Sequence, residues 1–296
     1  MTICIAARSD DSLLLASDRM LTGADLQFEP PRTKIIQITP SIFLMGAGDV
    51  TFQTTIVRAV MLRVQRIIAV KPNEWVNVAE VVRSYVNEWN ALKAQMAESA
   101  ILAPLGINNE LFIDRQRDFA TEVARDIVER LERFPVPECS AIIAGKDSTS
   151  TQIFTIVNNE VTDQQSIGFA CIGVGSRHAE SEFMLNRYTW NTPLAQALLH
   201  TYVAKKKAEV APGVGTHTDM VIVGPSLGQS NPIGDNAVSL LDSQYRQLLE
   251  AEQTARAKTL SNVQSYLDDL LRKASEQANA AAPVETQATG DGAAGV

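Results

Sequence analysis

The sequence predicts an α+β fold, namely a four-layer αββα sandwich of two β-sheets between outer helices, with an extra helix near the C-terminal end. Short β-branched and apolar runs separated by turn residues open the chain and recur after residue 139. A pair of segments with helical periodicity follows each block of strands. Strand blocks that alternate with helix pairs favour sheets covered by helices on their outer faces.

The first fifty residues contain two predicted hairpins. Their apolar runs span residues 2–7 and 13–16, then 34–38 and 42–46. Asp10 and Asp11 supply a tight turn within the first hairpin, and Thr39-Pro40-Ser41 interrupts the second. The second hairpin ends at Gly46-Ala47-Gly48-Asp49, where the pattern changes from strand to helix.

Helices dominate the next ninety residues. Apolar residues recur every three or four positions from Val57 to Ile68 and again over residues 78–92, which indicates two amphipathic helices. Residues 93–135 are expected to form a helical insertion with a helix over 119–131. Around Pro104-Leu105-Gly106 the pattern fits either a loop or a bent continuation of the preceding helix.

The remaining chain repeats the pattern and then changes character. Strands are expected at 140–144, 152–157, 167–172 and 220–223, with helices at 178–188 and 194–210. We therefore assign residues 1–230 to one domain and residues 231–280 to a C-terminal helical extension, with the helical pattern itself over 236–278. Its apolar spacing is irregular across residues 252–259, so a clean coiled coil is not supported. Residues 281–296 are expected to be disordered because they carry almost no large apolar side chain.

Composition argues against several function classes. Lys and Arg number 26 against 34 Asp and Glu, a net charge of −8, which disfavours nucleic-acid binding. Lys205-Lys206-Lys207 is the one dense basic cluster, and we expect it to be a solvated helix face. No apolar run approaches the roughly 20 residues that a membrane helix needs, and the N-terminus leads directly into a strand. We expect a cytoplasmic protein.

No cofactor or metal is predicted. Cys4, Cys139 and Cys171 are odd in number, far apart and without metal-ligand spacing, so we expect small buried side chains in a reducing compartment. The three histidines, His178, His200 and His217, are also scattered. Gly173-Val174-Gly175 lacks the rest of a dinucleotide fingerprint and is expected to be a turn.

A threonine at a processed N-terminus has the parts of a nucleophilic catalyst. Its own α-amine can take the hydroxyl proton, and that amine titrates near about 7.7–8.0 when free. A nearby lysine would lower the pKa of the amine, a carboxylate would hold the lysine charged, and a glycine N–H could bind the oxyanion. Thr2 is followed by Asp18, Lys34 and Gly48 after 16, 32 and 46 positions. Removal of Met1 is expected because threonine is a small penultimate residue.

Four stretches carry a resemblance to a known family: Thr2-Ile3-Cys4-Ile5-Ala6, Leu15-Ala16-Ser17-Asp18-Arg19, Arg32-Thr33-Lys34-Ile35 and Gly46-Ala47-Gly48-Asp49. They resemble the proteasome β-subunit family of N-terminal-nucleophile (Ntn) hydrolases and its bacterial relatives, the heat-shock protease peptidase subunit and the Anbu-type proteins. The resemblance implies that Thr2 is nucleophile and base, that Asp18 and Lys34 tune its ionisation, and that the Gly48 N–H forms the oxyanion hole. It further implies substrate backbone binding at Thr22 and a side-chain pocket lined by Val50, with Gly46 and Ile36 as further candidates.

The sequence departs from the family around the amine. The serine of the family's glycine-rich turn aligns with Val174, and Ser176 follows two residues later. The family's carboxylate and serine near the end of its fourth helix align with Glu209 and Pro212. Ser176 and Glu209 are therefore the predicted supporting residues. The 93–135 segment is also longer than the family's usual connection.

The predicted function is that of a threonine-type endopeptidase or amide hydrolase, acting on peptides or unfolded chains within a homo-oligomeric ring or open ring. Whether an ATP-driven unfoldase docks on it is not indicated by any pattern. One alternative is a weakly active or inactive proteasome-fold scaffold whose C-terminal helix packs on neighbours or recruits a partner. Another is a small-molecule amide hydrolase of the Ntn class, and at the site itself Asp18 and Lys34 could form an ordinary ion pair.

Overall fold

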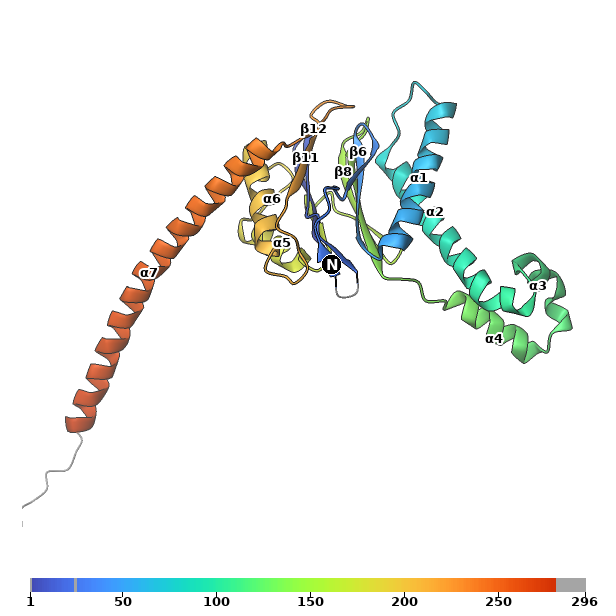
Figure 1. The fold of residues 1–296 in the computed structure, drawn as a ribbon. Helices are drawn as coiled ribbons and strands as arrows, with labels where there is room; N and C mark the ends of the chain where they lie inside the picture. The colour runs from blue at the N-terminus through green and yellow to red at the C-terminus, as the bar shows by residue number, and fades with distance from the viewer. Residues whose placement is uncertain (1, 24–25, 281–296) are drawn as a thin grey trace, which may run out of the picture. The chain divides into compact units, whose positions relative to one another are not determined.

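The computed structural model describes residues 2–23 and 26–280, and it divides into two compact units (Figure 1). The first unit ends at Leu241 and holds every described strand together with helices α1 to α6. The second unit begins at Asp242 and consists of the greater part of α7 (Asp235–Ala280). The predictions for Met1 and for the 281–296 tail lie outside the described residues.

Two five-stranded sheets, antiparallel throughout, form the centre of the first unit. The first sheet has the order β10 (Phe169–Ile172), β1 (Cys4–Ser9), β2 (Ser12–Ser17), β11 (Asp219–Val223), β12 (Ser230–Pro232). The second has the order β5 (Ile35–Thr39), β6 (Ile42–Gly48), β7 (Cys139–Lys146), β8 (Thr151–Val157), β9 (Glu160–Asp163). The prediction of a mixed α+β fold with antiparallel sheets is confirmed.

Apolar side chains from both sheets meet in one buried cluster. Cys4, Ala6 and Leu15 reach it from the first sheet, and Met45 and Ile142 reach it from the second. These positions alternate along each strand, because successive side chains of a strand point to opposite faces. The two sheets therefore share a core on their facing sides.

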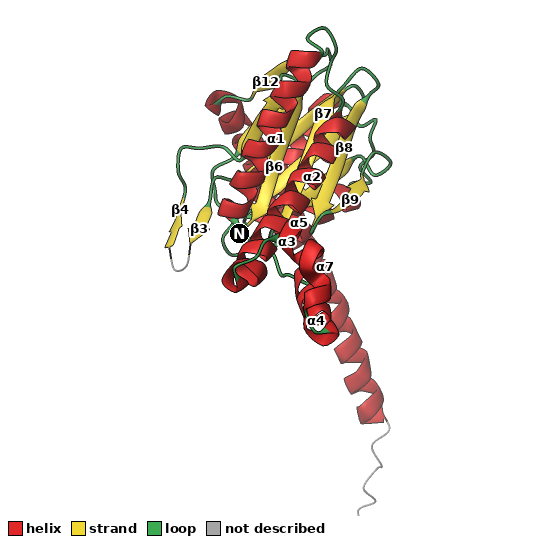
Figure 2. Ribbon diagram, turned by 90° about the vertical axis from the view of Figure 1, so that its right-hand side faces the viewer, coloured by secondary structure: helices red, strands yellow, loops and turns green. Residues whose placement is uncertain are grey.

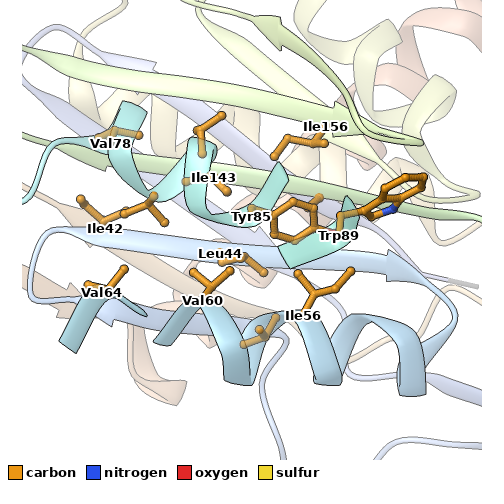
Figure 3. Close-up of a cluster of buried hydrophobic side chains, with 14 of the residues drawn as sticks. Ile42, Leu44, Ile56, Val60, Val64, Val78, Tyr85, Trp89, Ile143 and Ile156 are labelled. Atoms are coloured by element: carbon orange, nitrogen blue, oxygen red, sulfur yellow. The ribbon is translucent and has the colours of Figure 1, made fainter. Parts of the chain in front are cut away.

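Helices pack on the outer faces of both sheets. α1 (Val50–Val70) and α2 (Val78–Ala97) contact β6 and β7, and Figure 3 shows Ile56, Val60 and Val64 of α1 beside Leu44. α5 (Ser176–Leu185) and α6 (Leu194–Ala208) contact β10, β1 and β2 on the other side. The carboxylate of Asp49 caps α1 by accepting the Phe52 N–H at 2.7 Å, so the helix begins directly after β6.

The segment predicted as a helical insertion is helical over most of its length. α2 continues into a π-helical turn at Glu98–Leu102 and a 3₁₀ turn at Ala103–Leu105, so the bent continuation is the observed alternative. α3 (Asn109–Arg115), a 3₁₀ turn (Gln116–Asp118) and α4 (Thr121–Glu132) follow. Ile101, Leu102, Phe112 and Ile127 form a small hydrophobic cluster of their own there.

Several short strands were not predicted. They are β9, β12 and the two-stranded hairpin of β3 (Leu21–Gly23) and β4 (Leu26–Phe28), which Figure 2 shows set apart from the larger sheets. Segments of three or four residues contain too few positions for an alternation to be visible. The helix expected at 178–188 spans Ser176–Leu185, and the one expected at 194–210 ends at Ala208.

In the second unit, the described part of α7 carries exposed apolar side chains such as Leu260, Leu267 and Leu271. Across residues 2–23 and 26–280, no helix combines the length and the apolar character that a membrane span requires.

Candidate active site

Thr2 lies two residues before the first residue of β1, Cys4, and it is buried. The turn between β10 and α5 closes on its backbone, because the Gly175 N–H donates to the Thr2 carbonyl oxygen at 3.5 Å. Gly173 in the same turn has φ 98°, and a Cβ there would lie 2.2 Å from the Thr2 carbonyl oxygen. Only glycine fits at that approach, so the sequence-predicted turn is also part of the Thr2 site.

The β1–β2 hairpin brings Asp18 beside Thr2. Cys4 pairs with Ser17 in this hairpin, so the next residues outward, Ile3 and Asp18, come face to face. The Asp18 Oδ1 atom accepts the Ile3 N–H at 3.0 Å and the Thr2 hydroxyl at 2.5 Å. The carboxylate is thereby aligned with both the backbone and the side chain of the chain's start.

Lys34 reaches the same point from the segment before β5. Its Nζ donates to Asp18 Oδ1 at 2.7 Å and also to the Thr2 hydroxyl oxygen. The Thr2 hydroxyl therefore donates to a carboxylate and accepts from an ammonium group. The structure thus brings Thr2, Asp18 and Lys34 into one hydrogen-bonded group.

The electrostatics of the group favour an ionised Asp18. Burial opposes ionisation of this carboxyl, but the charge of Lys34 and hydrogen bonds from Lys34, Thr2 and the Ile3 N–H outweigh it. The net effect holds the pKa of Asp18 below its ordinary value of 3.8. The side chain of Asp18 has no exposed surface and that of Lys34 is 12% exposed, so solvent screens the pair weakly.

Gly48 ends β6 with φ 114°, where a Cβ would lie 2.3 Å from the Glu138 carbonyl oxygen. Asp49 and Lys146 donate their N–H groups across the β6–β7 ladder, to Glu138 and Ser41 respectively. Because antiparallel residues alternate in direction, the Gly48 N–H points to the opposite edge of β6. That edge is paired with β5 only as far as Met45, whose partner is Ile35.

Thr2 and Gly48 line the same pocket of ≈ 340 Å³. Its other lining residues are Ala47, Glu138, Cys139, Ser140, Val157, Asn158, Gly173 and Val174. The candidate substrate-binding residues lie elsewhere: Thr22 is in β3, Val50 begins α1, Gly46 is in β6 and Ile36 is in β5. A Cβ at Gly46 would lie 2.1 Å from Gln53 Oε1, so the side chain of Gln53 occupies the space beside that glycine.

The two predicted supporting residues lie at the ends of helices, and the Glu209 side chain pairs with lysines. Ser176 begins α5, and its N–H donates to the Gly173 carbonyl oxygen at 3.1 Å. The Glu209 carboxylate, just after α6, pairs with Lys205 at 2.6 Å and with Lys206 at 2.8 Å. The Glu209 carboxylate is thus engaged by lysines of α6 rather than by Thr2.

The expectation that Lys205-Lys206-Lys207 is a solvated face is wrong for Lys205. This side chain has no exposed surface, and its Nζ donates to Glu209 and to the carbonyl oxygens of Gly215 and Thr216. The signal in the sequence was its spacing from Ala197, Thr201 and Ala208, which are buried on the same helix. The basic run also matches the last turn of an exposed helix, where the positive charges of lysines interact favourably with the helix dipole.

The cysteines are free and buried as predicted. Burial raises the pKa of the Cys4 thiol to about 12, so it does not provide a thiolate at neutral pH. Among residues 2–23 and 26–280, no group of three or more His, Cys, Asp or Glu side chains is arranged to hold a metal ion.

A scan against protein-family models and a search among curated proteins both returned no match to this chain. The assignment of a function therefore depends on the geometry described above and on the spacing of its residues.

Proposed function

We propose that this chain is a threonine-type endopeptidase or amide hydrolase of the proteasome-type Ntn class, with Thr2 as its nucleophile. The observation that carries the proposal is that Asp18 and Lys34 both bond to the Thr2 hydroxyl. An ordinary surface ion pair contributes little to stability and would not require a fully buried carboxylate.

In this mechanism, removal of Met1 frees the α-amine of Thr2. The Thr2 oxygen attacks the substrate carbonyl carbon while its proton passes to that amine, directly or through a water molecule. The C–N bond then breaks as the leaving amine takes the proton, and an acyl ester remains on Thr2. Water hydrolyses the ester and regenerates the hydroxyl.

The neighbouring groups have separate roles in these steps. The ammonium of Lys34 lowers the pKa of the α-amine and stabilises negative charge on the Thr2 oxygen. Asp18 keeps Lys34 charged and in place. The N–H of Gly48, on the edge of β6 away from β7, is the oxyanion donor.

The finer architecture belongs to the same proposal. We infer that the two sheets with α1, α2, α5 and α6 form the four-layer αββα sandwich of Ntn hydrolases. The resemblance of residues 2–50 further favours a homo-oligomeric ring or open ring in the cytoplasm, with peptides or unfolded chains as substrates.

Intact mass spectrometry tests the proposal, before and after treatment with a β-lactone or epoxyketone probe for N-terminal threonines. We expect loss of Met1 and one adduct on the wild-type chain. Thr2→Ser, which keeps a hydroxyl, should still be labelled, and Thr2→Ala should not. All three residues are small, so Met1 removal is matched across the set.

The scaffold alternative is favoured by one observation: the Glu209 carboxylate, predicted to support the amine of Thr2, pairs with Lys205 and Lys206. A chain that retains Met1, or a processed chain that no probe labels, would contradict the enzyme proposal and support the scaffold.

A further inference from the structure

Lys205 is a buried cation that the mechanism above does not use. It lies in the last turn of α6, and its Nζ donates to Glu209 Oε1 at 2.6 Å, Gly215 O at 3.0 Å and Thr216 O at 2.9 Å. Burying an ammonium group is costly unless its hydrogen bonds are satisfied. Here two backbone carbonyl oxygens and one carboxylate satisfy them, so Lys205 holds the loop after α6 to the end of the helix.

The same loop contacts the proposed catalytic group on its other side. The Gly215 N–H donates to Asp18 Oδ2 at 3.0 Å, and the Met20 N–H donates to that oxygen at 3.1 Å. Gly215 thus accepts from Lys205 through its carbonyl and donates to Asp18 through its amide. A Cβ at Gly215 would lie 1.7 Å from Glu29 Oε1, so the loop has little room to move there.

We propose that Lys205 is a positioning residue for Asp18: it fixes the 213–216 loop so that the Gly215 N–H binds Oδ2 and leaves Oδ1 to Thr2 and Lys34. The catalytic part of this inference rests on the proposed function, whereas the positioning part does not. The hydrogen bonds of Lys205 go to Glu209, Gly215 and Thr216, and Lys205 does not line the ≈ 340 Å³ pocket, so the loop is its structural link to Asp18. The charge of Lys205 also attracts Asp18 through space.

Lys206 provides a matched control on the next position of α6. It pairs with the same Glu209 carboxylate at 2.8 Å, while the Gly215 and Thr216 carbonyl oxygens accept from Lys205. Lys205→Met and Lys206→Met each remove one positive charge beside Glu209. The loop loses its cation only in Lys205→Met.

Two measurements compare the variants in the full chain. Hydrogen exchange by mass spectrometry follows the peptides with Met20 and Gly215, whose amides report on Asp18 Oδ2 directly. Probe kinetics give the maximal rate of Thr2 labelling and the probe concentration at half-maximal rate. Misplacement of a catalytic group by about 1 Å can reduce a rate by about 100-fold.

For Lys205→Met we expect faster exchange in both peptides and a maximal labelling rate lower by about 10- to 100-fold. The half-saturating concentration should change by less than about twofold, because Asp18 does not bind the probe. Lys206→Met should match the wild type in both measurements. A loss of folded protein would lower the labelled fraction but not the rate constant of the molecules that react.

Wild-type exchange and wild-type labelling in a folded Lys205→Met protein would overturn the proposal. If that variant does not fold, Glu209→Gln takes its place, because it removes the charge that holds Nζ and keeps an acceptor oxygen. The same shifts, smaller in size, are then expected, and their absence would equally overturn it. If the wild type itself is not labelled, the proposed function fails, and the exchange measurement alone decides the positioning role.

Discussion

Replacing Asp18 by asparagine should strongly destabilise the first unit. The carboxylate is fully buried and accepts hydrogen bonds on both oxygens. Its donors are the Thr2 hydroxyl, the Ile3 N–H and Lys34 Nζ on Oδ1, and the N–H groups of Met20 and Gly215 on Oδ2. In either orientation of the asparagine amide, its NH₂ group would face hydrogen-bond donors instead of acceptors. Lys34 would also lose its counter-ion.

The structure sets the size of the effect. Removing one partner of a buried ion pair costs about 3–5 kcal/mol, a large part of the roughly 5–15 kcal/mol that stabilises a typical domain. For a unit of this length, each 1 kcal/mol shifts the Tm by about 2–4 °C, so a decrease of about 6–20 °C is expected. The rate of Thr2 labelling by the probe should fall by at least about 100-fold, because the variant loses a group that positions the Thr2 hydroxyl directly.

Denaturant unfolding at pH 7 measures the loss, and Asp11→Asn is the control. Asp11 also pairs with a lysine, Lys146, but its side chain is 72% exposed, so a change within about 0.5 kcal/mol is expected. The pKa of Asp18 is lowered by folding, so its stabilisation is present above the ordinary pKa and is lost as pH falls through the folded value. The difference between wild type and Asp18→Asn should therefore shrink below pH 3.8. Equal stability of the Asp18 and Asp11 variants at pH 7 would refute the reasoning.

Three further predictions follow from single contacts. Gly173→Ala would place a Cβ 2.2 Å from the Thr2 carbonyl oxygen, so labelling kinetics should show a rate at least about tenfold lower. Gly48→Ala would combine φ 114° with a clash against backbone, and urea unfolding should show a loss of at least about 1–3 kcal/mol. A wild-type midpoint would contradict that expectation. Asp147 is buried, and hydrogen bonds from the hydroxyl and N–H of Thr149 and from the Val78 N–H hold its pKa below 3.8 despite burial, so Asp147→Asn should cost about 1–3 kcal/mol at pH 7. Because that stabilisation is lost as pH falls through the lowered pKa, midpoints measured from pH 7 to pH 3 should converge, and a constant difference would count against it.

The proximity of Thr2 and Asp18 could be derived from the sequence itself. A tight turn at Asp10 and Asp11 fixes the register of the first hairpin, in which Ser9 pairs with Ser12 and Cys4 with Ser17. Continuing outward places Asp18 opposite Ile3, one residue from Thr2. The turn residues and the two-residue period of the strands are sufficient to predict that Thr2 and Asp18 lie close together.

The other partners depend on tertiary structure that no local pattern encodes. Lys34 follows the β3–β4 hairpin, whose strands of three residues are too short to show an alternation. The sequence placed Lys34 at the start of a predicted strand, and the resemblance assigned its role beside Thr2. The Gly215–Asp18 hydrogen bond spans 197 positions in the chain. Lys205 was misread because burial depends on what packs against α6, and a basic last turn is equally typical of exposed helices.

The nucleophile and the oxyanion donor belong to different sheets: Thr2 leads into β1, whereas Gly48 ends β6. The apolar side chains between the two sheets, which pack about 10 Å apart, therefore help to set where the Thr2 hydroxyl lies relative to the Gly48 N–H in the pocket that both line. Ala6 and Ala47 contribute to that layer from opposite sides. A larger side chain at Ala6 would push the sheets apart and so alter the reaction rate without contacting the substrate.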